Sequence, residues 1–173
     1  FIPFMGSGAG GSTALYGMAL ERFFPSDFLP KQNYPDAKET TLPEKWPISY
    51  DELRPYYEAA EKLFRVRGVS DPLKDESFDH LLPLPPLTPA AKELHDFFLD
   101  KGLHPYRLPM ACEFATGCEC CQSYLCNKNC KNDSARICLE PALTQYGAYL
   151  LDECEVLRLE EMQSEVTGVV CIR

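Results

Sequence analysis

Apolar residues recur at helical spacing in the stretch from 49 to 68. Ser49 and Glu52 at its start stand three residues apart, the pattern of a capping box. Pro55 limits that first turn or becomes the first residue of the main helix. The apolar residues that follow are Tyr56, Ala59, Ala60, Leu63 and Phe64. The pattern predicts a helix that ends near Gly68, with its aromatic side chains in a core.

A second helix is expected from Thr88 to Gly102. Thr88 is a favourable cap, and the proline after it suits a first helical position. Its apolar residues at helical spacing are Leu94, Phe97 and Phe98. A shorter helix is expected over 138–147, around the sequence Pro-Ala-Leu.

The pattern changes at both ends of the chain. Near the C-terminus, two β-rich runs at 156–159 and 166–170 flank a polar turn, which predicts a hairpin. Near the N-terminus, a glycine-rich turn over 6–11 precedes a helix expected over 12–22. The regions 23–48 and 69–87 are rich in proline and predict irregular surface structure and coil.

Length and charge limit the classes of function. With 173 residues the chain can hold one domain, since domains usually run about 100–200 residues. Its net charge of −9 argues against nucleic-acid binding, which needs clustered basic residues. No apolar run reaches the roughly 20 residues of a membrane span. Residues 1–4 resemble neither a signal peptide nor an initiator, so we expect an internal piece of a longer product.

The cysteines form the densest chemical feature. Seven of the nine lie between Cys112 and Cys138, and the odd total excludes complete pairing within the chain. Three chemistries remain open: an iron–sulfur cluster, zinc on Cys118/Cys121 and Cys126/Cys130, and disulfides or free thiols. The two cysteines outside this stretch, expected to be small buried apolar residues, are Cys154 and Cys171.

No catalytic residue is expected within the chain. His80, His95 and His104 are scattered, and none has a carboxylate at a convincing catalytic spacing. His95 is expected at the surface and His104 in a loop. The glycines from Gly6 to Gly11 match G-x-G-x-x-G, but the flanking residues do not resemble the strands of a dinucleotide-binding βαβ unit.

Three segments carry a resemblance to a known family. They are Gly10-Gly11-Ser12-Thr13 with Tyr16-Gly17-Met18 and Arg22; Trp46-Pro47-Ile48-Ser49-Tyr50-Asp51-Glu52-Leu53 with Pro55-Tyr56-Tyr57 and Ala60-Glu61; and Leu139-Glu140-Pro141-Ala142-Leu143 with Gly147-Ala148 and Val156. In this order they resemble segments of the glucose–methanol–choline (GMC) oxidoreductases. The resemblance implies FAD as cofactor. The residues that it places along FAD are Gly10, Gly11, Ser12, Thr13, Tyr16, Gly17 and Met18, with Val156 near the adenine. Tyr16 stands where the family has Asn or His.

The cysteine stretch extends the resemblance to one branch, the flavin subunits of bacterial sugar and sugar-acid dehydrogenases. The spacing Cys120-Cys121-x4-Cys126-x3-Cys130 is similar to that of members with a [3Fe–4S] cluster. The resemblance implies Cys120, Cys121 and Cys126 as its ligands. The cluster would relay electrons from the flavin to an acceptor such as a cytochrome subunit.

Together these features predict a partial FAD-binding domain of α/β class, α+β as the chain stands. Residues 1–30 would belong to that domain, 31–137 to a helical, loop-rich substrate side with the cysteine loop 112–138, and 138–173 to the domain again. The expected function is oxidation of an alcohol group of a sugar, polyol or sugar acid, with the catalytic histidine C-terminal to the chain. The alternative is a stand-alone binding module stabilised by zinc or disulfides. The bacterial cytoplasm and periplasm both stay open as the compartment.

Overall fold

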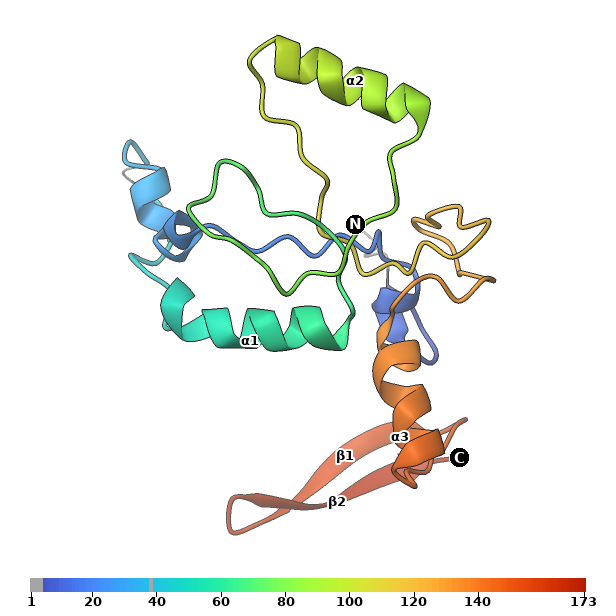
Figure 1. Ribbon diagram of the computed structural model, residues 1–173. Coiled ribbons are helices and arrows are strands. Elements are labelled where there is room, and N and C mark those ends of the chain that lie inside the picture. The colour runs from blue at the N-terminus through green and yellow to red at the C-terminus, as the bar shows by residue number, and fades with distance from the viewer. Residues whose placement is uncertain (1–4, 38) are drawn as a thin grey trace. The chain divides into compact units, whose positions relative to one another are not determined.

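The computed structural model describes residues 5–37 and 39–173, which fall into two compact units, Phe1–Leu139 and Glu140–Arg173. The first unit contains α1 (Tyr50–Leu63) and α2 (Pro89–Asp100), joined by long loops (Figure 1). In the second unit, α3 (Glu140–Gln145) precedes a hairpin of β1 (Glu155–Met162) and β2 (Glu165–Ile172). The chain therefore mixes helices with a two-stranded antiparallel sheet, while the wider FAD-binding fold stays a prediction.

Two expectations concern the limits of this description. Among the described residues, none of the helices has the length and apolar content needed to cross a bilayer. Residues 1–4, whose proline argued against a preceding strand, lie outside the described residues.

Helix α1 begins at the predicted capping box. The Ser49 hydroxyl accepts a hydrogen bond from the Glu52 N–H at 3.2 Å, and the Glu52 carboxylate accepts one from the Ser49 N–H at 2.8 Å. Pro55 lies inside the helix, so it does not mark the start of a separate helix. The helix ends at Leu63, earlier than expected, because Arg65 adopts a left-handed conformation with φ 52°.

Helix α2 confirms its predicted start and end. The Thr88 hydroxyl accepts a hydrogen bond from the Ala91 N–H at 3.3 Å, and Pro89 is the first helical residue. Beyond the last helical residue, Gly102 takes a φ of 73°, which favours glycine because it has no Cβ.

The predicted hairpin is confirmed as well. Gln163 and Ser164 have φ values of 53° and 65°, as a two-residue turn between twisted strands requires. Val156 is 61% exposed and its neighbour Leu157 is 50% exposed. Val169 and Ile172 of β2 are 53% and 58% exposed, and residues three positions apart in a strand point to opposite faces, so the hairpin carries exposed apolar side chains on both faces. The short helix before it, expected over 138–147, is α3, preceded by a π-turn over Ala135–Leu139.

The prediction of a helix over 12–22 is wrong. Only one 3-10 turn forms there, η1 (Gly11–Ala14), and Met18 has a φ of 63°. From Met18 onward the chain runs beside the segment 109–111: the Ala111 N–H donates to the Met18 carbonyl at 2.8 Å, and the Leu20 N–H donates to the Pro109 carbonyl at 3.0 Å. Long-range backbone pairing therefore replaces the local helix.

The segment 109–112 is the centre of the first unit. It pairs through isolated bridges or backbone hydrogen bonds with 18–20, with 66–69 and with 130–132. Four stretches far apart in the sequence thus meet without forming a regular sheet. The buried apolar side chains around this point include Met18, Val66, Ala111, Cys112 and Cys130.

A buried ion cluster fastens α1 to the loops. The Arg22 guanidinium donates to both carboxylate oxygens of Glu61, at 2.7 and 2.5 Å, and both side chains are nearly inaccessible. His80 Nε2 lies 2.6 Å from the same carboxylate, and the guanidinium lies 4.1 Å from the centre of the Phe78 ring. His80 therefore has a carboxylate partner, contrary to the sequence expectation, because α1 and the 69–87 loop bring together residues 19 positions apart.

Two other expectations about side chains have mixed outcomes. Of the aromatic residues expected in the core, Tyr56 is 68% exposed, whereas Tyr57 and Phe64 are partly buried; α1 fully buries Tyr50 and Glu61. His104 is exposed in a loop as expected, and His95 is only partly exposed, 3.6 Å from Asp96.

Replacing Glu61 with Gln should lower the free energy of unfolding by about 3–5 kcal/mol, because Arg22 would stay buried and charged without its anionic partner. Urea unfolding followed by circular dichroism measures the change. Asp51→Asn is the control, since the Asp51–Arg54 pair is exposed at 3.7 Å and its loss should cost at most about 1 kcal/mol. Equal effects of the two substitutions would contradict the role of the buried cluster.

Candidate functional site

The glycine-rich turn folds closely on itself. Gly8, Gly10 and Gly11 have φ values of 98°, 87° and 51°, in the left-handed region that glycine tolerates. A Cβ on Gly6 would lie 2.4 Å from the Gly11 carbonyl oxygen, so no larger residue fits there. A Cβ on Gly8 or Gly11 would meet nothing within 4 Å, so this face of the turn is open to a ligand.

Hydroxyl groups hold the turn in shape. The Thr13 hydroxyl donates to the Gly10 carbonyl at 2.6 Å and accepts from the Ser134 N–H at 3.0 Å. The Ser134 hydroxyl donates to the same carbonyl at 3.1 Å, and the Ser12 hydroxyl accepts from the Gly6 N–H at 3.1 Å. These contacts tie the turn to Ser134, and they occupy the hydroxyls of Ser12 and Thr13.

The tripeptide Tyr16-Gly17-Met18 lies deeper in the unit. The Tyr16 hydroxyl donates to the Asn132 carbonyl at 2.6 Å, and burial raises the pKa of Tyr16 above its usual range. The Met18 side chain is 1% exposed and packs with Cys112 and Cys130. Of the residues expected along FAD, Gly10 to Thr13 therefore lie in the open turn, whereas Met18 contributes to the core.

Val156, the residue expected near the adenine, lies in β1 of the second unit and is 61% exposed. Its contact with a cofactor stays a prediction.

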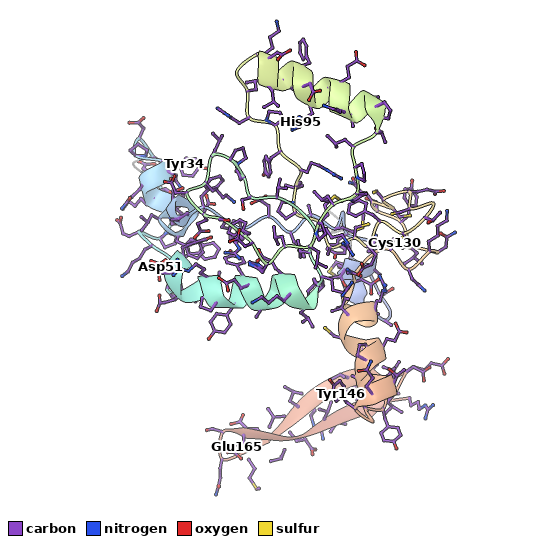
Figure 2. All side chains as sticks on the ribbon, viewed as in Figure 1. Tyr34, Asp51, His95, Cys130, Tyr146 and Glu165 are labelled. Carbon is purple, nitrogen blue, oxygen red and sulfur yellow. The ribbon has the colours of Figure 1, made fainter. Side chains whose placement is uncertain are left out.

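Several thiols converge in the cysteine loop, near the labelled Cys130 in Figure 2. The Sγ atoms of Cys112, Cys118 and Cys120 all lie within 4.8 Å of one another, and Cys112 and Cys118 are 3.6 Å apart. The buried Cys130 packs with them in the same apolar cluster. This group contains Cys120 but neither of the other two ligands expected for an iron–sulfur cluster, Cys121 and Cys126, so that ligand set stays a prediction.

The thiols differ in how strongly they hold a proton. Burial raises the pKa of Cys112 to about 12 and that of Cys130 to about 11. Burial acts in the same direction on Cys126, but backbone N–H groups, among them that of Cys130 at 3.3 Å, bring its pKa below the usual value. Burial also raises the pKa of Cys118, but the hydrogen bond from the Cys120 N–H at 3.5 Å outweighs it, so this pKa too lies below its usual value. The loop thus provides built-in donors for thiolate sulfur.

A buried lysine joins the cysteine loop to the glycine segment. Lys131 is 1% exposed, and its ammonium group donates to the carbonyls of Ala14 and Tyr16 at 3.0 Å and of Tyr124 at 2.9 Å. Sequence reasoning missed this residue, because lysines are mostly exposed and nothing in the pattern marks this one.

Glu113 clamps the start of the loop. It accepts hydrogen bonds from Arg65 at 2.6 Å, from Arg67 at 2.8 Å and from Asn132 at 3.2 Å. Burial alone would raise the pKa of this carboxyl, but these donors outweigh it and lower the pKa to about 2.

The two cysteines near the C-terminus do not behave as buried apolar residues. Cys171 is exposed and Cys154 is partly exposed. The prediction for Cys171 is wrong because both faces of the hairpin are open.

Comparison with known proteins gives the class of protein. No family model matches the chain. It is 30% identical to paromamine 6'-oxidase of Streptomyces fradiae over 98% of its own length and 32% of that protein. The values are the same for 6'''-hydroxyparomomycin C oxidase of Streptomyces lividus. It is also 37% identical to 2-methyl-1,2-propanediol dehydrogenase of Mycolicibacterium austroafricanum over 40% of its length and 12% of that enzyme.

These relatives are oxidoreductases, and the similarity to the first two runs along almost the whole chain. The chain spans about a third of their length. The similarity therefore indicates an oxidoreductase, and the particular activity is a matter of proposal.

Replacing Glu113 with Gln should remove a pH-dependent part of the stability. Its pKa lies below the ordinary value of 4.5, so its contribution is present above pH 4.5 and is lost as the pH falls toward 2. Near neutral pH, the free energy of unfolding of the wild type should exceed that of Glu113→Gln by up to about 3 kcal/mol. This difference should disappear in acid. Urea unfolding at several pH values measures this difference.

Glu119→Gln is the matched control in the same loop, because the Glu119 side chain is 78% exposed. A wild-type advantage over Glu113→Gln that did not change with pH would contradict the assignment.

Proposed function

We propose that the chain forms part of an FAD-dependent oxidoreductase of the GMC type that oxidises an alcohol group. The observation that carries the proposal is the similarity to two oxidases over 98% of the chain. The order of the three GMC-like segments supports the finer assignment, because they span the same chain from the glycine turn to Val156.

The glycine turn fits the pyrophosphate of FAD. Gly8 and Gly11 have left-handed φ values and no neighbour where a Cβ would stand, so a phosphate can approach the backbone there. The internal hydrogen bonds of Ser12 and Thr13 keep this turn rigid before a ligand arrives. When bound, FAD supplies the acceptor for the hydride that leaves the alcohol carbon.

The proton of the substrate hydroxyl needs a separate base. In the GMC family this base is a histidine in a C-terminal segment, so we assign it to a position beyond residue 173. The histidines of this chain have other environments: His80 is bound to Glu61 within the buried cluster, and His104 is exposed in a loop.

A [3Fe–4S] cluster on Cys120, Cys121 and Cys126 is implied only by the resemblance. The thiols that converge in the described structure form a different group, in which Cys112 and Cys118 accompany Cys120. Cys121 and Cys126 lie outside that group, and no electron-transfer step is derived from the cluster.

The substrate class is a sugar or polyol with an oxidisable alcohol. Two relatives are named for oxidation of aminoglycoside compounds and the third for 2-methyl-1,2-propanediol. Carbon 2 of that diol carries two methyl groups and no hydrogen, so only the primary alcohol at carbon 1 can give up a hydride. We therefore propose a primary alcohol as the reacting group.

Flavin binding tests the proposal in the complete gene product. The purified protein should show a flavin absorption spectrum that bleaches when a primary polyol is added without oxygen. Gly11→Ala should weaken FAD binding about tenfold or more, since a methyl group would stand where the phosphate approaches. Titration of the apoprotein with FAD, followed by flavin fluorescence, measures the affinity.

Gly102→Ala is the control, because Gly102 also has a positive φ and an open Cβ position but lies after α2, outside the turn. A complete gene product without bound flavin, or equal losses of affinity in the two variants, would overturn the proposal.

A further inference from the structure

Three thiols of the cysteine loop gather around one point, and a fourth packs beside them. Cys112, Cys118 and Cys120 have their Sγ atoms within 4.8 Å of one another, and Cys130 belongs to the same buried cluster. Cys112 and Cys130 are 0% and 2% exposed, and the other two are partly buried. This arrangement shields the sulfur atoms wholly or partly from water and brings three of them within reach of one partner, with Cys130 packed beside them.

The spacing of these sulfurs suits a single metal ion. A zinc–sulfur bond of about 2.3 Å implies a sulfur–sulfur distance of about 3.8 Å along the edge of a tetrahedron. Cys112 and Cys118 are 3.6 Å apart, close to that edge. Cysteines of an iron–sulfur cluster bind different iron atoms and therefore stand farther apart. A disulfide joins only two sulfurs, at about 2.05 Å, and does not account for a group of three or four.

We propose that Cys112, Cys118, Cys120 and Cys130 form a tetrathiolate site for one Zn²⁺ ion. Two ligands come from the ends of the loop, where Cys112 bridges Lys131 beside Cys130, and two come from its middle. This set differs from both sets that the sequence suggested, and it does not depend on the proposed flavin chemistry.

The surroundings fit a site with excess negative charge. Four thiolates and one Zn²⁺ ion carry a net charge of −2, which needs donors and cations nearby. The Cys120 N–H donates to the Cys118 sulfur at 3.5 Å. The ammonium group of the buried Lys131, the residue after Cys130, supplies a positive charge within the same part of the core.

The irregular shape of the cysteine loop requires a stabilising interaction. Residues 113–129 contain no helix or strand, and four residues there other than glycine have left-handed φ values: Phe114, Cys120, Ser123 and Asn129. Each such residue costs of order 1 kcal/mol or more, so other interactions must hold this shape. A structural zinc ion contributes folding free energy of the required kind.

Metal content and coordination test the proposal in the full-length protein, purified under reducing conditions. Mass spectrometry of the metals should find about one Zn²⁺ per chain. X-ray absorption at the zinc edge should find four sulfur ligands at about 2.3 Å. Exchange with Co²⁺ should give the intense thiolate-to-cobalt bands of a tetrahedral site. A protein that takes up neither ion, or that contains iron with acid-labile sulfide, would overturn the proposal.

Substitutions identify the ligands. Cys118→Ser and Cys130→Ser should each weaken Co²⁺ binding by at least about a hundredfold, whereas Cys126→Ser and Cys138→Ser should leave it within about twofold. Loss of the metal in Cys126→Ser with retention in Cys130→Ser would refute this ligand set. If a ligand variant does not fold, the number of sulfur ligands found by X-ray absorption in the wild-type protein tests the proposal instead. Fewer than four sulfur ligands would refute it.

Discussion

Many backbone carbonyl groups of the first unit lie outside helices and strands, and the fold of this unit depends on other partners for them. The ammonium group of Lys131 binds three carbonyls, from Ala14, Tyr16 and Tyr124, and so replaces part of a missing sheet. Burying a lysine is costly unless its donors are all used, and here all three are. This side chain, together with the hydrogen bond from the Tyr16 hydroxyl to the Asn132 carbonyl, holds the glycine segment against the cysteine loop, so the shape of each depends on the other.

Sequence alone predicted the elements whose cause is local. The Ser49 capping box, the Thr88-Pro89 start and the polar turn of the hairpin act within a few residues, and each forms where expected. The helix over 12–22 failed because its residues pair with 109–111, a contact that periodicity does not record. His80 gained its partner Glu61 in the same non-local way.

The cysteines show the same division between local and distant causes. Their spacing indicates a metal-binding or crosslinked loop, and the structure does bring thiols together there. Which thiols meet depends on the left-handed turns at Cys120 and Asn129 and on the pairing of Cys112 with Lys131. Spacing cannot supply either fact, so the ligand set drawn from resemblance and the one drawn from geometry share only Cys120. Tyr16 and Met18 pack against this thiol group, and the shape of the glycine segment therefore depends on it.

The central position of 109–112 has a consequence for how the chain assembles. Its partners include 18–20 near one end and 130–132 far along the chain, so the loops that must close are long and their contacts form late. On the ribosome, the glycine segment leaves the exit tunnel before the segment around 110 with which residues 18–20 pair, and Lys131 can bind its carbonyls only after residue 131 has emerged. Capped helices such as α1 can form in the meantime. The glycine segment of this unit is therefore made early and reaches its final contacts only after residue 131 has emerged.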